Sequence, residues 1–221
     1  MRNGYFQLVK AVGGYGVRLF PPVEGGEEIS LAELMHYLEH QNIAYDLSML
    51  KTAVAQKTAQ VFFLEPGDCP AVNEDYQLEV SADNMSATVR FFPASETGNR
   101  LTLDGFISDL RFKNIQYGIN MEVLQKHFMS EGIYCTSMVV AEGKQPRHGV
   151  DDRIEYFFNT DIHAQPEQRE DGTVDYYHLN MINHCKKGDV LAKIVRGDDG
   201  EDGTNILGQK IAPRTVKKLA L

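Results

Sequence analysis

The chain has 221 residues, 43% of them hydrophobic, which is enough to bury a core and to form about two or three subdomains without disulfide bonds. Its formal net charge of −9 at pH 7 repels phosphate backbones, so we expect no nucleic acid partner. No run approaches the roughly 20 apolar residues that span a bilayer, so we expect no membrane insertion.

The most informative feature of the sequence is an internal repeat. Residues 17–49 align with residues 89–121 without a gap, at a constant offset of 72 positions. Twelve of the 33 aligned pairs are identical, whereas ordinary composition gives roughly two by chance. The identical pairs are Val17/Val89, Arg18/Arg90, Phe20/Phe92, Pro21/Pro93, Glu24/Glu96, Gly26/Gly98, Leu31/Leu103, Leu38/Leu110, Asn42/Asn114, Ile43/Ile115, Tyr45/Tyr117 and Met49/Met121. The chain is therefore predicted to contain two copies of one module.

Each copy is predicted to open with a β-hairpin. Alternating apolar residues and turn residues predict strands over 5–9 and 17–20 in the first copy, and over 77–80 and 87–92 in the second. Both hairpins stop at a proline, which cannot donate to a sheet ladder. We expect these two prolines to lie in corresponding surroundings.

Helices are predicted to follow each hairpin. Ser30 is the expected N-cap of the first helix, with Glu33 reaching back as in a capping box. Thr102 is the expected cap in the second copy, where Gly105 replaces the glutamate. Further helices are predicted over residues 47–57 and 121–130, and each copy is predicted to close with a strand, over 60–64 and 137–141.

The remainder of the chain is predicted to be all-β. Short strand patterns occur over 174–177, 190–195 and 206–211, with a tight turn around Gly197–Gly203. The predicted fold class is α+β, with two tandem β-β-α-α repeat units related by a pseudo-twofold axis, followed by a small all-β, barrel-like subdomain. The predicted domains are residues 1–74, 75–150 and 151–221.

Arg18 and Arg90 are candidate ligand-binding residues, because they occupy matching positions before the aromatic ends of two strands. Two guanidinium groups at matching places can bind a carboxylate or a phosphate. Each can instead pair with the glutamate of its own loop, Glu24 or Glu96, and hold the turn in place. We favour the structural role.

Metal and cofactor sites are not predicted. The acidic segment Gly197–Gly203 offers oxygen ligands, but the calcium-loop pattern fails at Gly200 and Gln209. We interpret the segment as an acidic hairpin loop. His36 and His40 lie four residues apart with only Glu39 near them, and we expect them to be surface histidines.

Catalysis is not predicted either. Cys69, Cys135 and Cys185 show no paired spacing, which indicates reduced thiols and a cytoplasmic location. Cys185 lacks the motif context of a nucleophile. No glycine-rich nucleotide loop, nucleophile elbow or His-Glu-x-x-His motif occurs. We therefore expect a protein that is not an enzyme.

A series of residues, each only weakly distinctive, occurs in a fixed order along most of the chain. They are Met85, Ala87, Phe91, Pro93, Gly98, Leu101, Thr102, Leu110, Ile115, Tyr117, Gly118, Ile119, Ala141, Gly143, Pro146, Gly149, Asp151, Ile154, Tyr156, Phe158, Asp171, Gly172, Val174, Asp175, Tyr176, Gly188 to Ala192, Gly200, Gly203, Ile206, Gly208 and Ile211. This pattern resembles the N-terminal region of the bacterial flagellar assembly protein A family. One departure is Asp152, where a glycine usually follows Asp151.

The resemblance implies cytoplasmic scaffolding or protein recruitment, with no catalytic residues to carry over. It also implies a β-helix beyond Leu221, so we expect the natural chain to continue. Structural roles are expected at the matched motif positions. These are Pro21, Pro93, Tyr45, Tyr117, Gly118, Pro146, Gly149 and Asp151.

Three functions follow from the sequence. The preferred one is a non-enzymatic scaffold or protein-interaction module, with a protein partner bound near the two proline-ended hairpins and with homo-oligomerisation possible. The first alternative is a small-anion or nucleotide sensor that uses the cleft between the copies through Arg18 and Arg90. The weakest is a metal-dependent hydrolase built on Asp198–Asp202.

Overall fold

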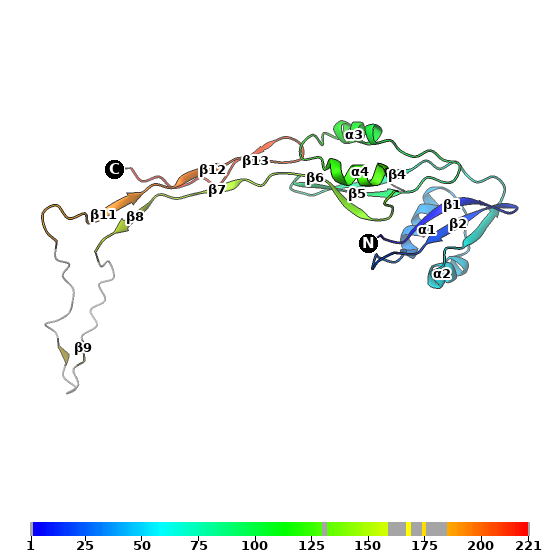
Figure 1. The fold of residues 1–221 in the computed structure, drawn as a ribbon, viewed down its shortest axis with the longest axis horizontal. Coiled ribbons are helices and arrows are strands. Elements are labelled where there is room, and N and C mark those ends of the chain that lie inside the picture. The colour runs from blue at the N-terminus through cyan, green and yellow to red at the C-terminus, as the bar shows by residue number, and fades with distance from the viewer. Residues whose placement is uncertain (1, 130–131, 159–166, 169–173, 176–184, 221) are drawn as a thin grey trace. The chain divides into compact units, whose positions relative to one another are not determined.

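The structure is a computed structural model, and it describes residues 2–129, 132–158, 167–168, 174–175 and 185–220. The protein is a mixed α+β chain with four helices and several small antiparallel sheets in this described part (Figure 1). The chain divides into two compact units. The first unit contains residues 1–145 and 204–211, and the second contains residues 146–203 and 212–221.

The first half of the first unit runs strand, strand, helix, helix, strand. Its elements are β1 (Tyr5–Ala11), β2 (Gly14–Phe20), α1 (Leu31–His40), α2 (Leu47–Gln56) and β3 (Val61–Pro66). The strands form one antiparallel sheet in the order β1-β2-β3. The predicted cap of the first helix is present, because the Ser30 hydroxyl accepts a hydrogen bond from the Glu33 N–H at 3.3 Å.

The second half repeats this order of elements. Its elements are β4 (Asp75–Val80), β5 (Ser86–Phe92), α3 (Leu103–Phe112), α4 (Met121–Met129) and β6 (Ser137–Glu142). The sheet order is β4-β5-β6, again antiparallel. Thr102 caps α3 by accepting from the Gly105 N–H at 3.2 Å, as the sequence predicts.

Strand pairing corresponds between the halves residue by residue. Val17 pairs with Phe62, and Val89 pairs with Met138, so the closing strands are offset by 76 positions when the central strands are offset by 72. Both central strands carry a register shift at the same place, after Tyr15 and after the corresponding Ala87. The pseudo-twofold relation between the halves and the predicted boundaries at 74 and 150 remain predictions.

The offset changes again before the second helix of each half. Asp46 caps α2 through the Met49 N–H, whereas Asn120 accepts from the Val123 N–H at the start of α4, which is an offset of 74. Tyr45 therefore does not correspond to Tyr117, although the two align in the sequence. The Tyr45 hydroxyl donates to Glu39 at 2.6 Å, and the backbone N–H of Tyr117 donates to the carbonyl of Ile206 at 3.0 Å.

The core of the first unit lies between the helices and the sheets and is continuous across both halves. Its largest fully buried side chains are Phe6, Leu8, Leu19, Leu34, Leu38, Leu50, Phe91, Phe106, Leu110, Ile115, Leu124 and Ile206. Burial of this apolar surface is the main stabilising contribution to the unit. It also fixes the position of α1 against the second half, where the candidate site lies.

The two proline loops share local backbone contacts but differ in burial. After Pro21, the Val23 N–H donates to the Arg2 carbonyl; after Pro93, the Ser95 N–H donates to the Val72 carbonyl. Pro93 is buried, whereas Pro21 is only half-buried.

The difference arises because the second loop lies against the first half. The Glu96 N–H donates to the Leu8 carbonyl at 2.9 Å, and Gln7 Nε2 donates to the Ala94 carbonyl at 2.9 Å. The expectation of corresponding surroundings for the prolines therefore holds for the backbone within each loop and not for the tertiary contacts.

A buried polar cluster lies in the second half. The Glu74 and His127 side chains are both 0% exposed, and Glu74 Oε1 lies 2.8 Å from His127 Nε2. Glu74 Oε2 accepts from the Leu101 N–H at 3.1 Å and lies 3.3 Å from Arg100 Nε. His127 stacks on Phe91 with ring centroids 3.9 Å apart. The cluster is satisfied, as buried charged groups must be.

The second unit is built from paired short strands. β7 (Arg147–Val150) pairs with β12 (Asp198–Glu201), and β8 (Arg153–Tyr156) pairs with β11 (Ala192–Val195), both antiparallel. Residues 198–201 are thus a strand, not the turn that the sequence predicts, because β7 pairs with them through its own backbone. Further strands of this unit are β9 (Glu167–Gln168) and β10 (Val174–Asp175), whereas β13 (Gly203–Thr204) and β14 (Lys210–Ile211) pair with each other in the segment that returns to the first unit. Barrel-like closure remains a prediction.

Close backbone approach explains two glycines of the second unit. A Cβ at Gly149 would lie 2.1 Å from the Asp198 carbonyl oxygen, and one at Gly197 would lie 1.7 Å from that of Val150. Pro146 immediately precedes β7 and is half-buried. The Asp151 carboxylate accepts a hydrogen bond from the Lys217 N–H at 3.0 Å, which holds the segment around Lys217 beside the end of β7.

Asp152, the departure from the family pattern, has a clear structural role. Its carboxylate accepts hydrogen bonds from the Gly197 N–H at 2.9 Å, from Arg196 Nη1 at 2.6 Å and from the Leu219 N–H at 3.1 Å. These bonds, with Gly197 the largest cause, lower the pKa of Asp152 to about 2. A glycine here would leave all three donors without this acceptor.

This lowered pKa predicts an acid-labile contact in the second unit. The unfolded-state pKa of Asp is about 3.9, so the contribution of Asp152 to stability is present above about pH 4 and is lost as the pH falls through about 2. Asp152→Asn is expected to remove this part of the pH dependence. NMR titration of the Asp152 carboxyl carbon checks the value, and a midpoint near 4 would contradict it.

Candidate functional site

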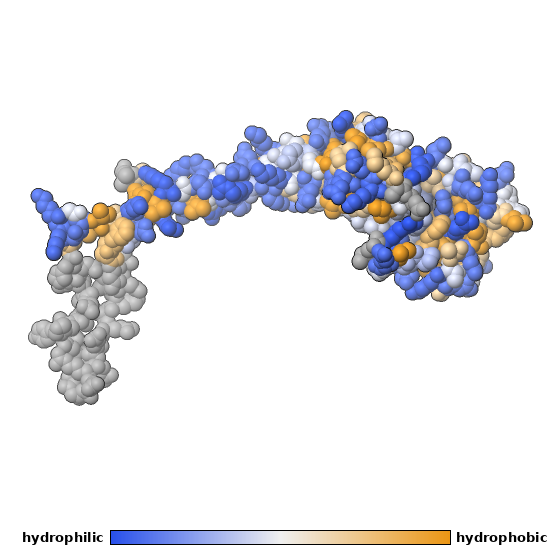
Figure 2. Space-filling model, viewed as in Figure 1, coloured by the Kyte–Doolittle hydropathy of each residue, from blue (hydrophilic) through white to orange (hydrophobic). Residues whose placement is uncertain are grey.

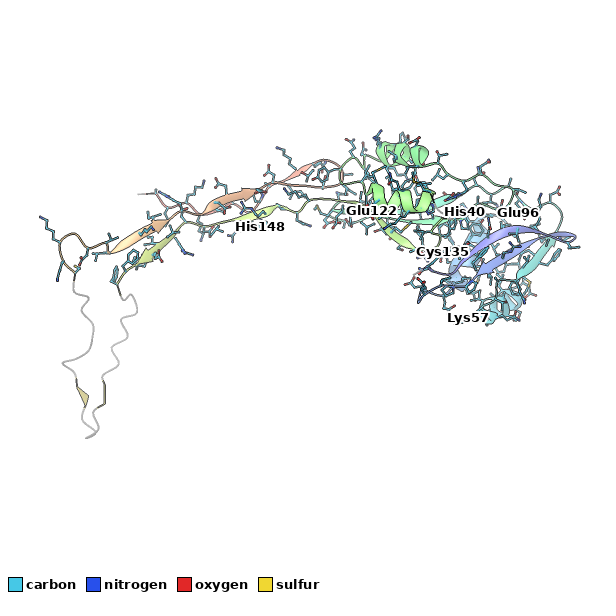
Figure 3. The ribbon with its side chains drawn as sticks, viewed as in Figure 1. His40, Lys57, Glu96, Glu122, Cys135 and His148 are labelled. Carbon is cyan, nitrogen blue, oxygen red and sulfur yellow. The ribbon has the colours of Figure 1, made fainter. Side chains whose placement is uncertain are left out.

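The candidate site is a groove within the first unit, between α1 of the first half and the outer face of the second sheet. One part has a volume of about 470 Å³, and a second part, of about 200 Å³, shares Glu33, His36, Gln77 and Phe92 with the first. The other lining residues are Ser30, Tyr37, His40, Gln41, Asp75, Tyr76, Glu79, Thr88, Val89, Arg90 and Ser137. Figure 3 labels His40, the last residue of α1.

The position of the groove follows from the local structure of both halves. α1 has a buried stripe of Leu34, Tyr37 and Leu38, so the intervening residues Glu33 and His36 face the second sheet. Strand β5 alternates between core and surface, which places Thr88, Arg90 and Phe92 on the same outer face. The groove is therefore lined by the polar side of a helix and the polar side of a strand.

An ion pair between Arg90 and Glu33 lies in the groove and joins the two halves. Arg90 Nη2 donates to Glu33 Oε2 at 2.8 Å, and Nε lies 2.5 Å from Oε1. The side chains are only 29% and 17% exposed, respectively. The pair is a partly buried, charge-assisted contact in which Nη2 makes the hydrogen bond and Nε lies close to the second carboxylate oxygen. The Glu33 side chain therefore serves this pair rather than the capping box predicted for it.

The groove has an acidic balance. Arg90 is neutralised by Glu33, the other acidic lining residues are Asp75 and Glu79, and the described lining includes no second Lys or Arg. Burial raises the pKa of Tyr37 and raises that of Tyr76 to about 12, so both phenols stay protonated at neutral pH. Such a surface attracts cationic groups and repels anions.

The structure does not bring the two candidate arginines to one groove. Arg18 is exposed on β2 and is not among the residues that line the groove around Arg90. The alternative prediction, that Arg90 pairs with Glu96 of its own loop, is wrong. Arg90 pairs with Glu33, and the Glu96 carboxylate accepts a hydrogen bond from the Lys10 N–H at 2.7 Å. Position 105, which corresponds to Glu33, is a glycine, so Arg18 cannot form the same pair on α3.

The remaining candidates show no reactive arrangement in the described part of the chain. Burial raises the pKa of Cys69 and raises that of Cys135 to about 12, so neither thiol is ionised near neutral pH. Cys185 is exposed. Among the described residues, no group of three or more His, Cys, Asp or Glu side chains could hold a metal ion. Asp198 and Asp199 instead pair with Arg147 and Lys218.

Sequence reasoning missed Glu33 as a site residue and the contribution of β4. The sequence predicts a capping role for Glu33, and no local pattern links a helix residue to an arginine 57 positions later. The available signal is a difference between the copies: Glu33 in the first corresponds to Gly105 in the second, whereas the arginine is retained in both, as Arg18 and Arg90.

None of the described helices is both long enough and apolar enough to cross a membrane.

These features define an α+β protein with an ion-paired polar groove between two similar halves. The family model of the Flagellar Assembly Protein A N-terminal region matches residues 76–221. Because this match covers more than half of the chain, the protein belongs to that family, which confirms the resemblance seen in the sequence. No curated protein and no solved structure matches the chain.

Family membership indicates a role in flagellar assembly, and the family is not a known class of enzyme. The match begins at Tyr76, within β4. It therefore includes the sheet side of the groove, with Gln77, Glu79 and Arg90, and not α1 with Glu33.

Proposed function

We propose that this chain is a cytoplasmic, non-enzymatic interaction module of a flagellar assembly factor, and that the groove between α1 and the second sheet binds a segment of a protein partner. The family assignment supports the assembly role. The tandem order of elements supports a scaffold, because two similar halves joined by a shared core present a fixed surface.

The observation that carries the proposal is the acidic balance of the groove. With Arg90 held by Glu33, the remaining formal charge comes from Asp75 and Glu79. The most suitable ligand is an extended polypeptide segment that carries Lys or Arg, because those side chains complement the carboxylates. Gln77, Thr88 and Ser137 offer neutral hydrogen-bonding groups to its backbone.

The alternative, a small-anion or nucleotide sensor, has less support from the same geometry. An anion would have to displace Glu33 from Arg90, and it would then face Asp75 and Glu79. Arg18 lies outside the groove and cannot contribute a second guanidinium there. We therefore favour a protein partner over a phosphate ligand.

Site-specific photo-crosslinking tests the proposal. A benzophenone amino acid replaces Gln77 in the groove or Gln125 on α4, both exposed positions, and the full chain is expressed in its own bacterium. We expect a reproducible protein adduct, identified by mass spectrometry, from position 77 and not from position 125. Adducts from both positions, or from neither, would argue against a partner in the groove.

Charge reversal provides the matched control. Glu79→Lys is expected to reduce the adduct at position 77 at least about tenfold, because it reverses a groove carboxylate that attracts the partner. Glu122→Lys, on α4, changes the net charge of the chain equally but lies outside the groove and should leave the adduct unchanged. An equal loss in both variants would indicate a general charge effect.

A further inference from the structure

Strand β3 has an open edge. It pairs with β2 on one side, and no described segment hydrogen-bonds to its backbone on the other side. An edge strand directs about half of its backbone N–H and C=O groups away from the sheet. Such an edge can pair with another strand unless the protein protects it.

The corresponding edge in the second half is covered over residues 140–142. There the Asn120 N–H donates to the Val140 carbonyl at 2.8 Å, and the Glu142 N–H donates to the Gly118 carbonyl at 3.0 Å. Ile119 also forms an isolated bridge with Ala141. The segment 118–120 therefore lies along β6 as a short extra strand of the same chain.

Two sequence differences explain why β3 lacks this cover. Pro66 holds the place of Glu142, since Gly14 pairs with Pro66 as Ser86 pairs with Glu142. A proline has no N–H, so the bond made by Glu142 is impossible at Pro66. Gly118 has a φ of +68°, and its counterpart two residues before the helix cap is Ala44, for which that conformation is strained.

Exposed apolar side chains lie on the outer face of this sheet, at β3 and at the nearby hairpin turn. Val61 is 37% exposed, Phe63 is 45% exposed, and Val12 at the tip of the β1–β2 hairpin is fully exposed. With Lys10 and Ala11 of β1 they line a hollow of about 590 Å³ that lies across the outer face of the sheet and reaches β3. Figure 2 shows hydrophobic residues at this hairpin tip. Exposed apolar groups beside unpaired backbone groups mark an association surface.

We propose that a second copy of this chain pairs with β3, so that two β3 strands lie antiparallel about a twofold axis and join two three-stranded sheets into one. An antiparallel edge is complementary to itself, and the resulting contact is closed and symmetric. Placing Phe63 opposite its own copy brings two aromatic rings together, a favourable cross-strand pair. This inference is independent of the groove and of its partner.

The charges of β3 permit this register. Glu65 is its only charged residue, and its carboxylate accepts the Tyr15 hydroxyl at 2.7 Å within the same chain. With Phe63 opposite Phe63, each Glu65 lies opposite Val61 of the second copy, so the carboxylates do not face each other. The stretch from Val61 to Phe63 contains none of the lysines that commonly block edge pairing.

Sedimentation equilibrium of the full chain tests the proposal. The average mass is expected to rise from the monomer value of 24.9 kDa toward twice that value as the concentration increases from about 5 μM to about 500 μM. Phe63→Lys should weaken association at least about tenfold. Val139→Lys is the matched control, because Val139 corresponds to Phe63, is equally exposed at 45% and lies on the covered strand β6.

Hydrogen exchange of the unaltered chain gives a second measurement that needs no variant. The amides of Val61 and Phe63, which face the open edge, should become protected as the concentration rises, and those of β6 should not change. A chain that stays monomeric throughout, or association that Phe63→Lys and Val139→Lys affect equally, would overturn the proposal. Failure here would leave crosslinking in the groove unaffected, because the two surfaces share no residue.

Discussion

Replacing His127 by alanine is expected to lower the free energy of unfolding of the first unit by about 3–5 kcal/mol. The imidazole is fully buried, and it is the partner of the equally buried Glu74 carboxylate at 2.8 Å. Its removal leaves Glu74 Oε1 without this hydrogen bond and creates a cavity beside Phe91, on which the ring stacks. Urea denaturation followed by circular dichroism measures the loss, because the chain contains no Trp.

The control is His36→Ala, at an exposed histidine on α1, which should change stability by about 0.5 kcal/mol or less. A double variant, Glu74→Gln with His127→Ala, is expected to recover part of the loss, because a neutral amide costs less to bury than an unpaired carboxylate. A loss below about 1 kcal/mol in His127→Ala would show that water or Arg100 replaces the imidazole.

The cluster also shows how the two halves diverge. Gly4 and Ala53 occupy, in the first half, the positions of Glu74 and His127. The offsets that relate them are 70 and 74, not the 72 of the sequence alignment. The first half therefore has two small residues at the positions where the second half has a hydrogen-bonded polar pair.

Local signals in the sequence were sufficient to predict most elements of the first unit. Ser30 and Thr102 cap helices where the pattern of cap and apolar stripe predicts them, because capping depends on a few neighbouring residues. Local signals could not show that Tyr45 and Tyr117, which align in the sequence, occupy different structural positions. An insertion of two residues between the helices shifts the second copy without breaking the run of identities.

Side-chain contacts between residues far apart in the chain could not be predicted from the sequence. The Glu33–Arg90 pair spans 57 positions and the Glu74–His127 pair spans 53, and neither follows from periodicity. The glycines and carboxylates of the acidic segment 198–201 predict a loop. It is a strand because β7 supplies backbone partners and Arg147 supplies a counter-charge to Asp198.

The second large effect is expected at Gly118, where alanine should destabilise the first unit by at least about 2 kcal/mol. Two separate costs add at this position. The φ of +68° is unfavourable for any residue with a Cβ, and that Cβ would lie 1.8 Å from the Glu142 carbonyl oxygen. Segment 118–120 must therefore move away from β6, which breaks the hydrogen bond from the Glu142 N–H.

Gly13→Ala separates these two costs. Gly13 has a φ of +82°, but a Cβ there would meet nothing within 4 Å, so this variant should lose only the conformational part, about 1 kcal/mol. Hydrogen exchange should show faster exchange of the Glu142 amide in Gly118→Ala and not in Gly13→Ala. Equal losses in the two variants would show that contact with the strand edge contributes nothing, and Gly118 would then be needed only for its backbone conformation.

The same variant connects stability with association. If segment 118–120 leaves β6 in Gly118→Ala, the second half acquires the open edge that Pro66 and Ala44 leave in the first half. Val139, already 45% exposed, would then lie beside unpaired backbone groups, as Phe63 does in the unaltered chain. Gly118→Ala should therefore associate more strongly than the parent chain. Adding Val139→Lys should abolish this added association, whereas Val139→Lys alone should not change association, because the edge is then covered.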